Sequence, residues 1–232
     1  MDIAVLIPAH EEAERIGLTV AAALEIPGVT RVVVVDDGSR DDTADRAEAA
    51  GAKAVRLVFN VGKGTAMEAG ASRVSNADIV LMLDGDLAET AGQAAVLLAP
   101  VLDGEADMSV AAFPRPTGKA GFGLVKRLAR FGISKMGGGF DATAPLSGQR
   151  AMTGACFEAV RPFASGYGVE VALTVRALRQ GFRIVEVPTT MAHAATGRDL
   201  KGFVHRGKQF VHVSIALTRL AFEKTPPAAN RG

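Results

Sequence analysis

The residues of this chain that could do chemistry begin with Asp84 and Asp86, which flank Gly85 and follow an apolar run, 79–83. Such a run is typical of a buried strand in a parallel sheet, and ligands bind beyond the carboxyl ends of these strands. Residues two apart in an extended segment point the same way, so both carboxylates can face one site. A hard cation would relieve their repulsion, because Mg²⁺ and Mn²⁺ bind one or two carboxylates together with substrate phosphates. The alternative is a solvated turn.

The strand before Asp84 belongs to a regular alternation of strands and helices. Strands are expected at 3–8, 32–35, 55–59, 79–83 and 108–113, with helices between them. This alternation predicts an α/β fold with a mainly parallel, doubly wound sheet. Residues 183–188 alternate and end in a proline, which favours an antiparallel or edge strand. A last helix is expected at about 203–223.

Length and composition fit one globular domain. The 232 residues are 48% hydrophobic and 22% charged. The single cysteine, Cys156, excludes an internal disulfide and suits a reducing compartment. The N-terminus lacks the basic region of a signal peptide, and no apolar run reaches the length of a membrane span. We expect one domain over 1–224, a disordered tail at 225–232, and a cytoplasmic location, with peripheral contact at the inner membrane face left open.

Charge is distributed unevenly. Residues 1–110 carry 19 acidic and 8 basic side chains, net −11, whereas residues 111–232 carry 6 acidic and 18 basic, net +12. This asymmetry predicts an acidic half that holds a metal and a basic half that binds an anionic partner. Segment 114–139 is basic and amphipathic, so it is either a surface helix with snorkelling cations or an element that binds a membrane or an anion. Nucleic acid is not expected, because this half has few aromatic residues on which bases could stack.

Three more polar clusters follow predicted strands, namely Pro8-Ala9-His10-Glu11-Glu12, Asp36-Asp37-Gly38-Ser39 and Asn60-Val61-Gly62-Lys63-Gly64. With Asp84-Gly85-Asp86, their order and spacing resemble the signatures of family-2 glycosyltransferases with the GT-A fold, over roughly residues 3–200. One departure is Glu11, where the family usually has asparagine. The resemblance implies roles for Pro8, Ala9 and Glu12 at base and ribose, Asp36 or Asp37 at the base, Lys63 at the pyrophosphate, and Asp84 and Asp86 at ribose and metal.

The second half resembles two subgroups of that family. Segments 147–151, 168–171 and 181–188 look like polyprenyl-phosphate sugar transferases such as dolichyl-phosphate mannose synthases. Segment 167–170, with His193 downstream, also resembles glucosyl-3-phosphoglycerate synthases, in which a histidine completes the metal shell. The resemblance therefore implies Mn²⁺ or Mg²⁺ on Asp84, Asp86 and His193, and Glu170 as an acceptor-side acid. Acceptor binding is assigned to Gly148, Gln149, Arg150 and Arg198, the two arginines because guanidinium pairs bidentately with phosphate or carboxylate.

These residues predict a metal-dependent transfer of sugar from a nucleotide-diphosphate sugar, UDP-glucose or similar, to a polyprenyl phosphate or a phosphoglycerate-like acceptor. Asp86 and Glu170 are the expected catalytic residues. Glu170 orients or deprotonates an alcohol, and only positions groups if the acceptor is a phosphate. Inversion or retention, and a homodimer, stay open. The rivals are a sugar-phosphate nucleotidyltransferase, whose glycine-rich signature is missing after the first strand, and a non-catalytic nucleotide-sugar-binding protein.

Overall fold

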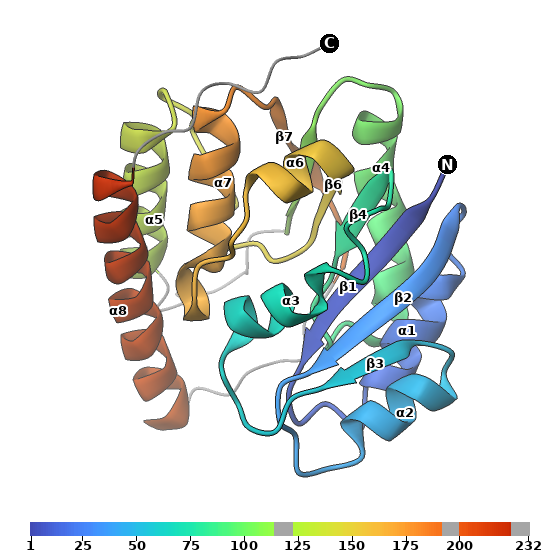
Figure 1. The fold of residues 1–232 in the computed structure, drawn as a ribbon. Coiled ribbons are helices and arrows are strands. Elements are labelled where there is room, and N and C mark those ends of the chain that lie inside the picture. Colours follow the sequence, from blue (N-terminus) through green and yellow to red (C-terminus); the bar gives the residue numbers. More distant parts are fainter. Residues whose placement is uncertain (114–122, 192–199, 224–232) are drawn as a thin grey trace.

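The computed structural model describes residues 1–113, 123–191 and 200–223 and contains one seven-stranded sheet (Figure 1). The strands are β1 (Ile3–Ala9), β2 (Val29–Asp36), β3 (Lys53–Arg56), β4 (Ile79–Met82), β5 (Met108–Ala112), β6 (Arg150–Thr153) and β7 (Ile184–Pro188). Their order across the sheet is β3-β2-β1-β4-β6-β5-β7. The mainly parallel α/β architecture expected from the sequence is confirmed.

The strand β6 is the one element of this sheet that the sequence did not predict. It pairs antiparallel with both β4 and β5, whereas β7 pairs parallel with β5. The edge position predicted for 184–188 is therefore correct, and the antiparallel alternative was wrong. The third strand is also shorter than expected, because it ends at Arg56 and leaves Val58 and Phe59 exposed.

Helices cover both faces of the sheet (Figure 1). One face carries α1 (Ile16–Leu24), α2 (Thr43–Ala49), the 3-10 helix η1 (Ala88–Ala94) and α4 (Ala95–Leu102). The other face carries α3 (Lys63–Ala71), α6 (Gly154–Ala159), the short 3-10 turn η2 (Gly166–Gly168) and α7 (Val169–Arg179). A further layer, α5 (Gly123–Met136) and α8 (Leu200–Phe222), packs outside α7.

The alternation of residues along β1 explains these layers. Ile3, Val5 and Ile7 pack into the core under α1 and α4, whereas Ala4 and Leu6 pack into the core under α3 and α7. Both cores are apolar because a parallel strand is buried on both faces. Along β1 the polar side chains consequently come only after the strand, from His10 onward, where the site forms.

The segment expected to be basic and amphipathic forms α5 from Gly123 onward, while 114–122 lie outside the described residues. The predicted disordered tail likewise falls outside them. The last helix was predicted at 203–223 and begins three residues earlier, at Leu200. Among the described helices, none combines the length and the hydropathy that a membrane span requires.

Candidate active site

The carboxyl ends of β1, β2 and β4 open into a cavity of about 570 Å³. Seven of the residues assigned from the sequence line it, namely Pro8, Ala9, Glu12, Asp37, Lys63, Asp84 and Asp86. They come from segments up to 78 residues apart in sequence, and the parallel register of β1, β2 and β4 brings them to one edge. The expectation that these polar clusters share a site is therefore met by the geometry.

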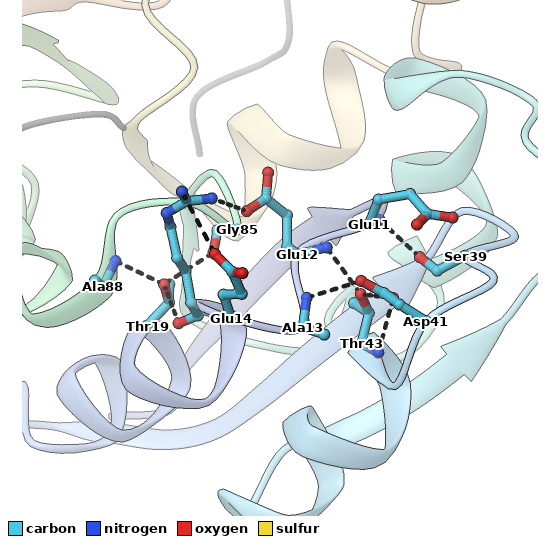
Figure 2. Close-up of polar contacts among 11 residues, drawn as sticks. Glu11, Glu12, Ala13, Glu14, Thr19, Ser39, Asp41, Thr43, Gly85 and Ala88 are labelled. Carbon is cyan, nitrogen blue, oxygen red and sulfur yellow. Dashed lines mark hydrogen bonds and ion pairs between the residues drawn. The ribbon is translucent and has the colours of Figure 1, made fainter. Parts of the chain in front are cut away.

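The loop after β1 is tied to the loop after β2 (Figure 2). The backbone N–H of Glu11 donates to Ser39 Oγ at 2.9 Å, and that of Glu12 donates to Thr43 Oγ1 at 2.8 Å. Glu11 has a φ of 58°, a left-handed conformation that suits asparagine better than glutamate. Its carboxylate accepts the N–H of Arg40 at 2.8 Å and does not line the cavity. The departure from the family pattern at position 11 therefore changes a contact between two loops and not the lining of the cavity.

The loop after β4 is fixed from the other side by α1 (Figure 2). Thr19 is fully buried, and its Oγ1 donates to the carbonyl of Gly85 at 2.9 Å while accepting the N–H of Ala88 at 2.8 Å. Two hydrogen bonds from one buried hydroxyl hold the backbone on both sides of Asp86. The spacing of Asp84 and Asp86 is therefore preset by the fold.

The paired aspartates at the end of β2 differ in what they do. Asp36 accepts the N–H of Ser39 at 3.0 Å, which closes the turn before α2. Asp37 accepts the N–H of Val61 at 2.7 Å and that of Gly62 at 2.9 Å, and it lines the cavity. Since each carboxylate oxygen has a second lone pair, Asp37 can still accept from a ligand. Of the two alternatives, the geometry favours Asp37 as the residue at the base.

Lys63 connects two acidic residues that lie far apart in the sequence, Asp84 and Glu170. Its Nζ lies 2.6 Å from Asp84 Oδ1 and 2.8 Å from Glu170 Oε1. Burial opposes the charge of this ammonium, but the carboxylates of Asp84 and Glu170 outweigh it and raise the pKa of Lys63. Lys63 therefore stays charged at neutral pH. Nothing in the sequence indicated this contact, because Asp84 has no cationic neighbour along the chain.

A metal ion would meet a suitable donor set at the end of β4. Asp84 and Asp86 both line the cavity and offer only oxygen donors, as Mg²⁺ and Mn²⁺ prefer. Burial, and next the charge of Asp86, raise the pKa of Glu12, and both residues line the cavity. The described residues contain no group of three metal-ligating side chains. Two carboxylates plus substrate phosphates satisfy such a cation, so the residues present fit it.

The segment before β6 contacts Asp84. Gln149 is fully buried, and its Nε2 donates to Asp84 Oδ2 at 2.6 Å. A Cβ at Gly148 would lie 2.6 Å from Lys63 Nζ and 2.8 Å from Asp84 Oδ2, so only glycine fits there without a shift. Gln149 thus holds Asp84 in place, and Gly148 leaves room for Asp84 and Lys63; acceptor binding by these two residues stays a prediction.

Arg150 corrects one of our expectations. It begins β6 rather than lying in a polar loop, and its side chain is fully buried. Its guanidinium donates to the carbonyls of Ser147 (3.0 Å) and Glu170 (3.0 Å) and to Thr174 Oγ1 (2.8 Å). Burial lowers its pKa to about 10, which still leaves it charged at neutral pH. A fully buried guanidinium whose donors are taken by internal acceptors cannot bind an acceptor molecule. Arg150 instead fixes the start of α7, where Glu170 lies.

Two other expected residues, His193 and Arg198, lie outside the described residues. The structure adds cavity residues that sequence reasoning did not select: Lys208 and His212 of α8, with Tyr167 of η2. Lys208 and His212 are four residues apart, so they share one face of the helix. That spacing is a signal in the sequence, but nothing local indicates that this face of α8 lines the cavity.

Known proteins match most of this chain. The model of "Glycosyl transferase family 2" matches residues 4–154. Glycosyltransferase AglJ of Haloferax volcanii is 33% identical over 205 residues, which are 85% of this chain and 65% of that protein. A glucosyl-3-phosphoglycerate synthase of Mycolicibacterium paratuberculosis is 32% identical over 195 residues, 75% of this chain and 59% of that enzyme. The chain thus spans less than two thirds of the length of either protein.

Solved structures agree with the sequence relatives. The crystal structure of glucosyl-3-phosphoglycerate synthase from Mycobacterium tuberculosis in complex with Mg²⁺ and UDP superposes with a TM-score of 0.78 at 26% identity. The match covers 96% of this chain and 80% of that one. Another structure of that enzyme, with Mn²⁺, UDP and phosphoglyceric acid, gives the same TM-score and identity over 94% and 78% of the two chains. The GT-A fold expected from the sequence is confirmed.

Proposed function

Because this chain belongs to glycosyltransferase family 2, we propose that it transfers a sugar from a nucleotide-diphosphate sugar, UDP-glucose or a close analogue, to an anionic acceptor. One observation carries the proposal: Lys63 connects Asp84 of the donor half to Glu170 of the acceptor half at the edge of one cavity. Relatives that bind UDP and phosphoglyceric acid support the choice of substrates. The division of the site into a donor half, 1–110, and an acceptor half, 111–224, belongs to the same proposal.

The donor binds along the ends of β1, β2 and β4. Pro8, Ala9 and Glu12 form the floor under base and ribose, and Asp37 accepts a hydrogen bond from the base. Lys63 reaches the diphosphate from the start of α3, where Gly62, with a φ of 88°, lets the backbone approach closely. The buried hydrogen bonds behind these residues keep the pocket preformed, so little ordering is needed on binding.

Asp84 and Asp86 would hold Mg²⁺ or Mn²⁺, with His193 proposed as a third ligand. The cation, when bound, supplies Lewis-acid stabilisation of the charge that develops on the departing diphosphate. Asp84 is oriented for this by Gln149 and Lys63, and Asp86 by the backbone hydrogen bonds of Thr19. The protein thus contributes orientation before any ligand arrives.

Glu170 defines the acceptor side. It starts α7, its side chain is 9% exposed, and it accepts from Lys63. If the acceptor is an alcohol, as in phosphoglycerate, Glu170 is placed to orient or deprotonate the hydroxyl. If the acceptor is a polyprenyl phosphate, the nucleophile is already an anion and Glu170 only positions it. The phosphoglyceric acid in the neighbouring structures favours the first case.

The proposal includes a cytoplasmic location, with the basic face of α5 as the candidate for membrane contact. Lys126 and Arg127 are exposed on that helix, whereas Arg130 is paired with Asp141 at 2.6 Å. Changing Lys126 and Arg127 to glutamate should release the protein from anionic vesicles if the acceptor is lipid-linked. If the native protein never binds such vesicles, the lipid-linked acceptor is excluded and the soluble acceptor is favoured.

The decisive experiment follows Mn²⁺-dependent binding and turnover of UDP-glucose in native protein and in Asp86→Ala. Since Asp86 lies in the loop beyond β4, its loss should abolish both while leaving the free energy of unfolding close to that of the native protein. The matched control is Asp103→Ala, an exposed aspartate at the end of α4. Full activity in Asp86→Ala, or equal activity in EDTA, would refute the metal-dependent mechanism. Formation of UDP-glucose from UTP and glucose 1-phosphate would favour a nucleotidyltransferase instead.

A further inference from the structure

A second anion must be accommodated in the cavity, and this inference rests on the proposed function. The donor brings a diphosphate, and an anionic acceptor brings a charge of its own. Lys63, which is paired with Asp84 and Glu170, is assigned to the donor diphosphate, and Arg150 is fully buried. The acceptor charge therefore needs another counter-ion on the cavity wall.

One wall of the cavity is built by α8 and η2, which fit closely together. A Cβ at Gly166 would lie 2.3 Å from His212 Nδ1, and one at Gly168 would lie 2.5 Å from Ala216 Cβ. The ring of His212 stacks on Tyr167, with centroids 5.5 Å apart and planes at 26°. The backbone N–H of Tyr167 donates to His212 Nδ1 at 3.2 Å. Two glycines thus admit the helix, and His212 anchors it in one position.

Lys208 is placed on this wall by the same anchor. It precedes His212 by one helical turn, is exposed, and lines the cavity with Gly166 and Tyr167. It forms no ion pair with any residue in the described part of the chain. Tyr167 in turn lies in η2, which runs directly into α7, and the first turn of α7 carries Glu170. The ammonium therefore stands on the acceptor side of the site.

We infer that Lys208, positioned by His212, binds a phosphate group of the acceptor. Lysine suits this task because its ammonium is a compact charge with three donors on a flexible stem. Because His212 Nδ1 accepts a hydrogen bond, the neutral ring carries its hydrogen on Nε2, which can donate to the same oxyanion. The phosphate can belong to a small phosphorylated acid or to a lipid, since both present the same terminal oxygens.

Calorimetry on the full chain, saturated with UDP and Mn²⁺, tests the assignment with two soluble probes. 3-Phosphoglycerate carries the phosphate and glycerate lacks it, so their difference isolates the phosphate contact. Lys208→Met should weaken 3-phosphoglycerate binding about tenfold and leave glycerate unchanged. Lys208→Arg should keep most of the affinity, and the matched control, Lys135→Met on α5, should behave as native protein. A parallel arm measures capture by phosphatidylcholine vesicles with and without undecaprenyl phosphate.

The outcomes separate the alternatives. Loss of 3-phosphoglycerate binding alone supports a soluble phosphorylated acceptor, and loss of vesicle capture alone supports a lipid-linked one. If Lys208→Met instead weakens UDP binding and spares both acceptor arms, Lys208 serves the donor diphosphate and the inference is overturned. Equal binding of all probes by native protein and Lys208→Met also overturns it. Failure of native protein to bind UDP with Mn²⁺ would reject the proposed function. The role of Lys208 would still be tested in that case, by comparing how native protein and Lys208→Met bind 3-phosphoglycerate and glycerate.

Discussion

Replacing Lys63 with methionine should raise the affinity for Mn²⁺ in the absence of nucleotide and lower the affinity for UDP. The ammonium lies 2.6 Å from Asp84 Oδ1, and the side chains of both residues are 22% exposed, so solvent screens the pair only in part. A hydrogen bond to a charged group contributes about 1.5–3 kcal/mol. A cation that takes Asp84 must displace at least one such bond, so Lys63 should weaken nucleotide-free Mn²⁺ binding about tenfold.

Lys63→Met removes that competition, and Mn²⁺ should therefore bind about tenfold more tightly in the absence of nucleotide. The affinity for UDP at saturating Mn²⁺ should instead fall by a similar factor, because the variant lacks the cation that reaches the diphosphate. Electron paramagnetic resonance of free Mn²⁺ gives the first quantity, and calorimetry with UDP at saturating Mn²⁺ gives the second.

Two controls make the comparison sharp. Lys53→Met removes an exposed lysine on β3 and should change neither affinity. Urea denaturation of Lys63→Met measures how much the free energy of unfolding falls when Asp84 and Glu170 lose their shared ammonium. That loss must be small enough for the variant to stay folded. If nucleotide-free Mn²⁺ binding is unchanged or weaker in a folded Lys63→Met, Lys63 is no competitor for the metal position and the argument from its geometry is wrong.

Three other predictions concern single positions. Gly148→Ala should weaken Mn²⁺-dependent UDP binding at least about tenfold in calorimetry, because the new Cβ would lie 2.8 Å from Asp84 Oδ2; native-like affinity would contradict this. Burial opposes the charge of Glu68, but Arg161, at 2.7 Å, holds its pKa below the usual range. Glu68→Gln should therefore lower the free energy of unfolding by about 1 kcal/mol in urea denaturation at about pH 7, and the difference should vanish as pH falls through that lowered pKa. Burial raises the pKa of Cys156 to about 12, so a disulfide reagent should label it slowly in native protein and rapidly after denaturation; rapid native labelling would show that the helix opens.

The donor half of the site could be predicted from sequence because its signals are local. Each of its polar clusters directly follows an apolar strand, and parallel strands bring their carboxyl ends to one edge. Asp37, Lys63 and the two aspartates after β4 therefore converge as expected, and they line one cavity. Here the order of motifs along the chain and their arrangement in space carry the same information.

The acceptor half could not be predicted in the same way, because its contacts depend on chain-distant packing. Arg150 reads as an available cation in a glycine-containing segment, yet β6 pairs with strands on both sides and buries it. Lys63 and Asp84 are 21 residues apart, and Lys63 and Glu170 are 107 apart, so no window of sequence shows either ion pair. Lys208 reaches the cavity only because Gly166 and Gly168 admit α8.

The position of β6 has a consequence for how the chain is made. On a ribosome, β4 is completed at Met82, but the neighbour that covers its free edge, Arg150–Thr153, is synthesised about seventy residues later. Until then Ile79–Met82 offers unpaired backbone groups on an apolar strand, the kind of edge that recruits other chains. A fragment that stops near residue 110, where the charge of the chain changes sign, would keep that edge permanently. We therefore expect such a fragment to aggregate, and to become soluble only when the remainder of the chain is supplied with it.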